Sequence, residues 1–329
     1  MKRNDALIDL HLHLDGSMSL DSVKELATMQ QIVIPDTDED LRKMLQVSEG
    51  CRDLNEYLEK FEFPCSLMQT EAGLCTAVQH LEAELAAQGL LYAEIRFAPQ
   101  LHTLRGLTQR EVVAAAVSGM GKSSLKSSLI LCCMRGNDNH EANLETIRVA
   151  KEFLEKGVGA IDLAGAEALF PTEDFEDLFV LAKEWKIPYT IHAGEAAGPE
   201  SVYKALEFGA KRIGHGVRSL EDEKLIKRLA EEGITLELCP TSNLNTNIFG
   251  NYAEYPLRNL MEAGVKVTIN TDNMTVSNTT VAKELQHMAD ALGLTEAELR
   301  QLAENAAEVA FADEATKNWV KKEIGKRFA

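Results

Sequence analysis

The chain has 329 residues, of which 45% are hydrophobic, and it carries a formal net charge of −18. This length is sufficient for a sizeable hydrophobic core, and the acidic balance argues against nucleic acid or an anionic membrane surface as a partner. Because no run of about 18 apolar residues occurs, a transmembrane helix is not expected either.

The first residues of the chain and the spacing of its cysteines are typical of a cytoplasmic protein. Because the first predicted strand begins at residue 6, we do not expect a signal peptide. No Cys-x-x-Cys spacing occurs, so we expect reduced thiols in a cytoplasmic protein. The six cysteines are Cys51, Cys65, Cys75, Cys132, Cys133 and Cys239.

Short apolar runs alternate along the chain with longer amphipathic stretches. Helix-like segments such as 70–89, 139–157 and 173–186 separate the apolar runs, and several end at a glycine. Strands that alternate with helices indicate a parallel sheet, and eight strands indicate a closed (β/α)8 barrel. The apolar runs predict strands at 6–12, 90–97, 128–134, 159–164, 187–193, 212–216, 234–239 and 265–270.

We expect residues 1–329 to form a single α/β domain of the TIM-barrel type. Residues 15–89 are a long, mainly helical insertion after the first strand, and residues 295–329 add helices at the C-terminal end. An open, doubly wound sheet is the alternative, although no glycine-rich fingerprint follows the first strand.

Polar residues collect where the predicted strands end. In (β/α)8 barrels the C-terminal ends of the strands build the active site, so reactive side chains at that face predict a site rather than a core. The residues are His11, His13, Arg96, Asp162, His192, Glu195, His215, Ser242, Asn243, Asp272 and Asn273.

Four of these residues are candidate metal ligands. His11 and His13, in IDLHLHLDG (8–16), are i and i+2 neighbours and share one face of a strand. With His192 and Asp272 they offer three imidazoles and a carboxylate, and a position remains for water. This donor set suits zinc or a similar divalent ion. A hydrogen-bonded core histidine or a capping aspartate is the usual alternative for any one of them, but their joint placement favours a metal site.

Two further groups lie close to this donor set in the sequence. Glu195 ends HAGE (192–195) and suits a general acid or base, whereas the alternative is a glutamate in the first turn of a helix. His215 lies between two glycines in RIGHG (212–216), which allow it to approach a ligand closely. It is either another metal ligand or a group that orients the water, and spacing does not separate these roles.

Six motifs occur in the order found in the adenosine deaminase branch of the metal-dependent amidohydrolases. The chain resembles that branch from residue 8 to about 273 and through the helical end. The P-C-x-x-C and H-x-E motifs of the other zinc deaminase design are absent. The six motifs are HLHLDG (11–16), IDLAG (161–165), HAGE (192–195), RIGHG (212–216), CPTSN (239–243) and NTDN (270–273).

The resemblance implies a chemistry for the metal set and its neighbours. Glu195 would protonate a purine ring at N1, and His215 would orient or deprotonate the attacking water. Zinc lowers the pKa of a bound water from ~15.7 to ~7, and ring protonation makes the purine a better electrophile. One zinc ion and the water would be bound by His11, His13, His192 and Asp272.

The resemblance also implies how a purine nucleoside is bound. Asp15 would hold the ribose, Gly165 would offer its backbone to the purine edge, and His13 would also face the substrate. Ser242 would support Asp272 from behind. Among the remaining polar residues at the strand ends, the resemblance assigns a role only to the residue at position 273.

Position 273 departs from the family pattern, which commonly has a second aspartate after the metal-binding one. This chain has Asn273. N7 of adenosine is an acceptor, and a side-chain amide can donate to it whereas an ionised carboxylate cannot. An ordinary loop asparagine that starts a helix is the alternative.

The segment DLNEYLEKFEF (53–63) places Leu54, Leu58 and Phe61 on one helical face. The resemblance implies that a helix here covers the apolar side of the nucleoside pocket as a lid. Ordinary core packing is the alternative interpretation of the same three side chains.

We therefore expect zinc-dependent hydrolytic deamination of adenosine and 2′-deoxyadenosine to the corresponding inosines and ammonia. A ribose-binding Asp15 favours a nucleoside over adenine, and no basic cluster lies near the motifs to bind the phosphate of AMP. A modified adenosine, an aminodeoxyfutalosine-type nucleoside or adenine are alternative substrates. A catalytically silent metal-binding protein is the remaining alternative, but it would be expected to lack a ligand or the acid.

Overall fold

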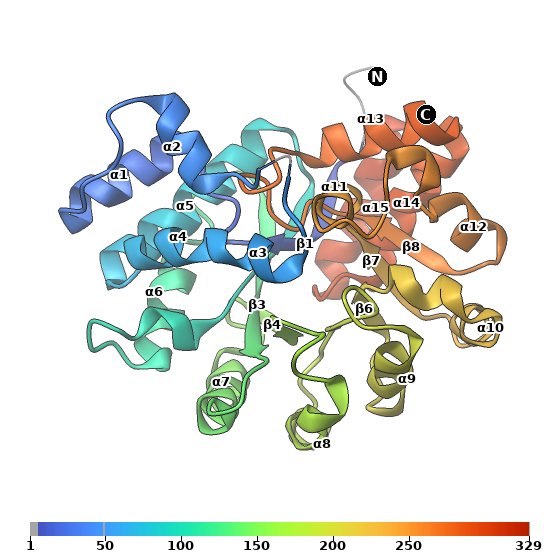
Figure 1. The fold of residues 1–329 in the computed structure, drawn as a ribbon, viewed down its shortest axis with the longest axis horizontal. Helices are drawn as coiled ribbons and strands as arrows, with labels where there is room; N and C mark the ends of the chain where they lie inside the picture. The colour runs from blue at the N-terminus through green and yellow to red at the C-terminus, as the bar shows by residue number, and fades with distance from the viewer. Residues whose placement is uncertain (1–5, 49, 329) are drawn as a thin grey trace.

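Eight parallel strands form a barrel in the structure, a computed structural model that describes residues 6–48 and 50–328 (Figure 1). Strands β1 to β4 pair in chain order, and so do β5 to β8. Isolated bridges join Leu12 to Asp272 and Ile161 to Tyr189, which close the barrel on both sides. The predicted (β/α)8 barrel is confirmed. The strands are β1 Ile8–His13, β2 Tyr92–Phe97, β3 Lys126–Met134, β4 Val158–Ala164, β5 Ile191–Ala193, β6 Arg212–His215, β7 Thr235–Leu238 and β8 Lys266–Ile269.

Strand β5 is shorter than the sequence predicts. The apolar run 187–193 contains Pro188, which has no N–H group for a sheet ladder. Only Ile191–Ala193 forms a regular strand, although the carbonyl of Pro188 accepts a hydrogen bond from the N–H of Ile161 at 3.0 Å. The irregular part of the run therefore still joins β4 to β5.

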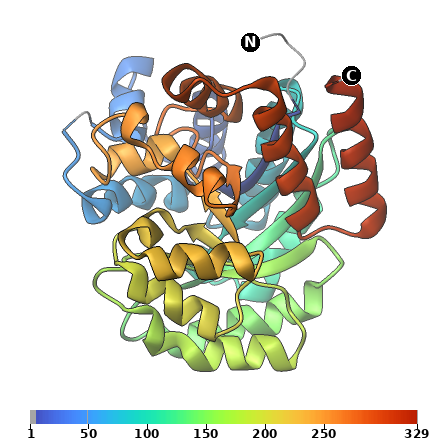
Figure 2. The same cartoon turned by 90° about the vertical axis from the view of Figure 1, so that its right-hand side faces the viewer.

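Helices surround the barrel, and the C-terminal ones, red in Figure 2, lie along one flank, where α14 packs against β1 and β8. The predicted insertion, residues 15–89, contains α1 to α5, and its last helix, α5, packs against α6. The α-helices are α1 Leu20–Gln30, α2 Asp38–Leu45, α3 Leu54–Leu58, α4 Glu62–Leu67, α5 Glu71–Ala87, α6 Gln109–Gly119, α7 His140–Phe153, α8 Glu176–Glu184, α9 Pro199–Glu207, α10 Glu223–Glu231, α11 Pro240–Asn245, α12 Leu257–Glu262, α13 Val281–Leu292, α14 Glu296–Val309 and α15 Glu314–Arg327. Short 3-10 helices are η1 Glu59–Phe61, η2 Pro99–His102, η3 Thr172–Phe175, η4 Val217–Glu221 and η5 Tyr252–Glu254. In the part of the chain that the structure describes, no helix is both long enough and apolar enough to cross a membrane.

A buried carboxyl group connects α13 to the segment after β7. Glu284 is fully buried, its Oε2 accepts the backbone N–H of Thr241 at 3.1 Å, and its Oε1 accepts the hydroxyl of Thr279. Burial raises the pKa of Glu284 from its ordinary value of 4.5 to about 7, against the lowering effect of these bonds. The folded protein therefore keeps a proton on Glu284 over a pH range in which the unfolded chain has released it.

We predict that Glu284→Gln flattens the pH dependence of stability. Because the folded-state pKa is raised, the free energy of unfolding of the wild type should fall as pH rises from about 4.5 to 7. The free energy of unfolding of the variant should not fall over this range. Between pH 4.5 and pH 8, the difference between the two proteins should therefore change by up to about 3 kcal/mol in favour of the variant. Denaturant unfolding at pH 5, 6, 7 and 8 measures this, with the exposed Glu308→Gln as control. Parallel curves for the wild type and Glu284→Gln would contradict it.

Candidate active site

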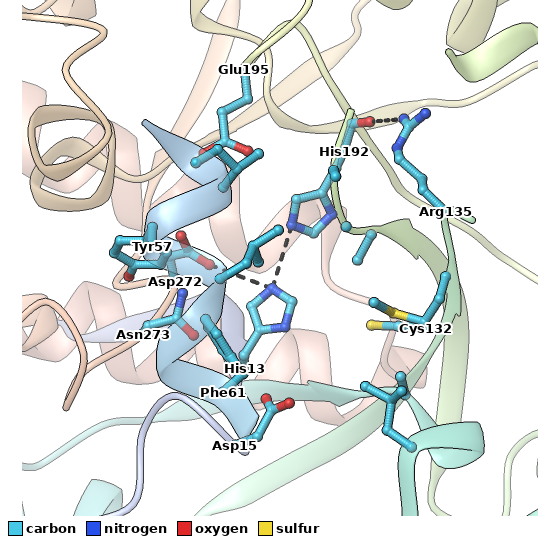
Figure 3. A pocket seen from close by; sticks show the side chains of 18 of the residues that line it. His13, Asp15, Tyr57, Phe61, Cys132, Arg135, His192, Glu195, Asp272 and Asn273 are labelled. Atoms are coloured by element: carbon cyan, nitrogen blue, oxygen red, sulfur yellow. Dashed lines mark hydrogen bonds and ion pairs between the residues drawn. The ribbon is translucent and has the colours of Figure 1, made fainter. Parts of the chain in front are cut away.

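Three imidazoles and one carboxylate meet at the C-terminal ends of β1, β5 and β8. His11, His13, His192 and Asp272 each contribute one ligand atom, and these atoms lie within 4.8 Å of one another. His13 Nε2 is 3.4 Å from both His192 Nε2 and Asp272 Oδ1 (Figure 3). His11 Nε2 is buried without a hydrogen-bond partner among the described residues, 3.5 Å from Asp272 Oδ1. The structure thus brings the four predicted ligands together.

The outer ring nitrogens show that these residues fit a divalent cation. His11 Nδ1 lies 2.9 Å from Glu237 Oε2, and His192 Nδ1 lies 2.9 Å from Asp162 Oδ2. A carboxylate beside Nδ1 keeps the imidazole proton on that nitrogen, so the Nε2 lone pair points to the centre. Converging neutral nitrogens with one carboxylate are a donor set that zinc prefers.

Arg96 links the two carboxylates behind the histidines. Its fully buried guanidinium donates to Asp162 Oδ2 at 2.8 Å and to Glu237 Oε2 at 2.9 Å. Arg212 donates to the other oxygen of Glu237 at 2.6 Å. No motif predicted a role for Glu237, but a glutamate within the apolar run ITLELC (234–239) is a detectable signal, because charged side chains are seldom buried without a partner.

The turn after β8 directs the Asp272 carboxylate at the metal set. Asp272 has a φ of 60°, a left-handed conformation that non-glycine residues seldom adopt and that concentrates at functional sites. Its N–H donates to the carbonyl of His11, and its carbonyl accepts from the N–H of His13, both at 2.7 Å. Closure of the barrel between β1 and β8 therefore also places the fourth ligand.

Glu195 and His215 face the same centre. His215 Nε2 lies 3.6 Å from Glu195 Oε2 and 4.0 Å from Asp272 Oδ2. Its Nδ1 lies 3.0 Å from Asn243 Nδ2, and Asn243 Oδ1 accepts the hydroxyl of Tyr255 at 2.9 Å. Tyr255 thereby orients the amide so that it donates to Nδ1, which leaves the His215 proton on Nε2.

The environment of Glu195 favours a neutral carboxyl group. Burial raises the pKa of Glu195 well above its usual value, and the negative charges of Asp272 and Glu167 raise it further. A carboxylic acid that still holds its proton near neutral pH can serve as a general acid.

A cavity of about 310 Å³, lined mainly by apolar side chains, opens beside these groups. In the view of Figure 3, Glu195 and Asp15 lie at opposite ends of it, with His13 and His192 between them. Asp15 Oδ2 accepts the thiol of Cys65 at 3.5 Å, and burial raises the pKa of Asp15 to about 6. Volumes of about 300 Å³ and above are typical of small-molecule sites.

Known proteins resemble this chain over nearly its whole length. A model of the family described as adenosine deaminase matches residues 6–327. The chain belongs to the adenosine deaminase family. It is 48% identical over 331 residues to an adenosine deaminase of Haemophilus ducreyi, covering 98% of this chain and 96% of that protein. It is 38% identical over 325 residues to an adenosine deaminase of Enterococcus faecalis, with coverage of 98% and 96%.

Two solved deaminase structures have the same fold as this chain. An adenine deaminase from Arthrobacter aurescens superposes with a TM-score of 0.88 at 27% identity, covering 98% of both chains. The N6-methyl-AMP deaminase of Arabidopsis thaliana superposes with a TM-score of 0.85 at 24% identity, covering 98% of this chain and 97% of that one. At that identity the second likeness concerns the barrel fold alone.

In this adenosine deaminase family member, the other predicted substrate residues also lie at the cavity. Gly165 and Asn273 line it, and Gly165 has a φ of 109°, which favours glycine. A Cβ on Gly16 would lie 1.8 Å from Asn273 Oδ1, so the glycine of HLHLDG makes room for that amide. Ser242 is buried, but within the described residues no hydrogen bond joins it to Asp272.

The segment predicted as a lid lies against the cavity. Leu54, Leu58 and Phe61 line it, and the Phe61 ring centroid is 6.5 Å from that of His13. Tyr57, for which no motif predicted a role, lines it too, and its hydroxyl lies 2.7 Å from Ser277 Oγ. This bond fastens α3 to the loop after β8, and closure by the lid stays a prediction.

Proposed function

We propose that this protein catalyses zinc-dependent hydrolytic deamination of adenosine and 2′-deoxyadenosine to inosine and 2′-deoxyinosine with release of ammonia. The observation that carries the proposal is the position of Glu195 beside three converging histidines and an aspartate, on the wall of an apolar cavity. The adenosine deaminases at 48% and 38% identity support the same substrate.

His11, His13, His192 and Asp272 would hold the zinc ion. When bound, such an ion lowers the pKa of water from ~15.7 to about 7 and so supplies hydroxide at neutral pH. The tautomers that Glu237 and Asp162 impose on two of the histidines keep their Nε2 lone pairs available for it.

Glu195 and His215 act on the two reacting partners. The neutral carboxyl group of Glu195 donates its proton to N1, which draws electrons from C6 and prepares it for attack. The Nε2–H of His215 donates a hydrogen bond to the attacking oxygen. Because Asn243 donates to Nδ1, this arrangement supports an orienting role rather than deprotonation of the water. Addition of hydroxide at C6 gives a tetrahedral intermediate. The proton of the added hydroxyl group then passes to the amino group as the bond between C6 and that nitrogen breaks, so that ammonia leaves and the C6 carbonyl of inosine remains, with the Glu195 proton on N1.

Asp15 supports a nucleoside as substrate. Its Oδ1 is buried without a hydrogen-bond partner among the described residues and is available to a ribose hydroxyl. Arg135 is the only arginine or lysine among the described residues that line the cavity, and it already donates to the carbonyls of Phe170 and His192. Arg135 lies beside His192 and away from Asp15 (Figure 3), so a phosphate at the ribose end would meet the Asp15 carboxylate without a cation next to it.

Turnover measurements test the substrate directly. Zinc-loaded protein is incubated with adenosine, 2′-deoxyadenosine, adenine, AMP and N6-methyl-AMP, and both ultraviolet absorbance and ammonia are followed. We expect conversion of the two nucleosides with a kcat/KM far above that of the base or the nucleotides. A preference for adenine, AMP or its methylated form would overturn the proposed substrate.

The proposed contact of Asn273 with purine N7 predicts a loss that depends on the substrate. Replacement of N7 by carbon, as in 7-deazaadenosine, removes the acceptor, so Asn273→Ala should lower kcat/KM for adenosine roughly 3- to 10-fold more than for the deaza compound. For each substrate, kcat/KM of the wild type is divided by that of the variant. The different electronic properties of the two rings cancel when these two ratios are compared. An equal loss for both substrates would exclude a hydrogen bond to N7.

A further inference from the structure

Glu167, two residues after IDLAG, has a carboxylate enclosed by backbone N–H groups. It is 1% exposed, and the hydroxyl of Ser201 donates to its Oε1. One side chain therefore satisfies four successive N–H groups of the segment after β5. The carboxylate accepts these N–H groups at 2.7 to 3.0 Å from Gly194, Glu195, Ala196 and Ala197.

This arrangement resembles an anion site that the protein fills itself. Successive N–H groups form a concave site for anions, and helix α9, which begins at Pro199, adds its positive N-terminal end. Hydrogen bonds to an ionised acceptor are about twice as strong as neutral ones. Glu167 is thus a firm anchor for the segment, and no free anion is needed there.

The anchored segment carries Glu195. The N–H of Glu195 is one of the four bound groups, and Arg135 holds the start of the segment by donating to the carbonyl of His192 at 2.6 Å (Figure 3). The backbone between His192 and Ala197 is therefore held at both ends. Glu167 also contributes, after burial and Asp272, to the raised pKa of Glu195.

We propose that Glu167 is a positioning residue for the deamination, because it sets where the Glu195 carboxyl group points relative to purine N1. This inference rests on the proposed function. Proton transfer needs donor and acceptor within about 2.6–3.2 Å, so a small displacement of the segment costs rate even when substrate and metal still bind. Glu167 neither lines the cavity nor belongs to the candidate metal ligands, so it acts through Glu195.

Glu167→Gln is the test variant, because it keeps the shape of the side chain. Its amide oxygen can still accept the three N–H groups at the Oε2 position, but its amide nitrogen would face the N–H of Gly194 and the negative charge is lost. We expect kcat to fall about 10- to 100-fold, with KM within about threefold of the wild type and unchanged metal content. Rates are expressed per inosine-binding site, as measured by calorimetry, so that misfolded protein does not lower the value of kcat.

Glu200→Gln is the matched control. Glu200 belongs to the same connection, accepts only the N–H of Gly198 at 3.0 Å among the bonds described, and does not line the cavity. Its kcat should stay within about twofold of the wild type. An equal loss in both variants, or an unchanged kcat per site in Glu167→Gln, would overturn the proposal.

A double-mutant cycle separates positioning from a merely structural role. If Glu167 acts through Glu195, Glu167→Gln should add almost no loss of kcat in a Glu195→Gln background. The same fractional loss in both backgrounds would mean that Glu167 acts independently, and the proposal would fail. Hydrogen exchange of the amides at 194–197 should be faster in Glu167→Gln, and unchanged exchange would also contradict it.

A wrong proposed function would be detected separately, by assaying the wild-type protein with adenosine. If wild-type protein does not convert adenosine, the proposed substrate is wrong. The cycle is then measured with whichever aminated purine the wild type does convert, and the same two outcomes decide the role of Glu167.

Discussion

Glu195→Gln should lower kcat for adenosine by about 100- to 10,000-fold while the protein keeps its metal and still binds inosine. An amide has no acidic proton to deliver to N1, and positioned general acids contribute about this much. The substitution preserves the shape of a side chain that is 3% exposed, so packing is largely unchanged. Steady-state kinetics, metal analysis and inosine calorimetry on the same preparation measure the three quantities.

The metal content decides the interpretation of that variant. Loss of metal together with activity would mean that Glu195 supports the ligand set, and the acid role would be withdrawn. Retention of more than about a tenth of the activity would also contradict the role, because a general acid is worth more than this. Glu200→Gln again serves as the control on the same connection, since it lies outside the cavity.

Arg96→Met should destabilise the folded protein by about 3–5 kcal/mol and weaken metal binding about 10- to 100-fold. Removal of one partner of a buried ion pair leaves the other charge uncompensated, and here Asp162 loses its guanidinium partner. Asp162 and Glu237 also orient His192 and His11, and loss of such support typically costs this much metal affinity. Denaturant unfolding of the metal-free protein and chelator competition give the two numbers.

Arg110→Met is the control for the buried arginine. Arg110 pairs with Glu152 at 2.7 Å, but its side chain is 60% exposed. Exposed pairs contribute at most about 1 kcal/mol, so this variant should be nearly as stable as the wild type. If Arg96→Met is no less stable than Arg110→Met, the buried network does not stabilise the fold.

The strands could be predicted because their signal is local. Each of the eight apolar runs overlaps one strand of the barrel, since a strand of a parallel sheet is buried on both faces and is therefore apolar along its length. The run 187–193 shows the limit of this signal. The apolar pattern extends through Pro188, but the missing N–H group shortens β5 to Ile191–Ala193.

The candidate site could be predicted only where its residues lie at strand ends or in short motifs. His11, His13, His192 and Asp272 were found in this way, and the barrel brings them together. The residues that hold these side chains and their segments in place were not recognised from the sequence. Glu237, Glu167 and Tyr255 have roles that depend on residues 28 to 226 positions away or on the fold of a neighbouring loop.

The sequence by itself determined the type of fold and which residues are candidates for the metal ligands and for the acid, because apolar periodicity and residue type are local properties. Only the tertiary structure decided which imidazole nitrogen faces the centre, that the proton of His215 lies on Nε2, and that Glu167 anchors the segment of Glu195. Each of these depends on hydrogen bonds between residues that are distant in the chain. Such bonds become possible only when closure of the barrel brings the strand ends and their loops within about 3 Å of one another.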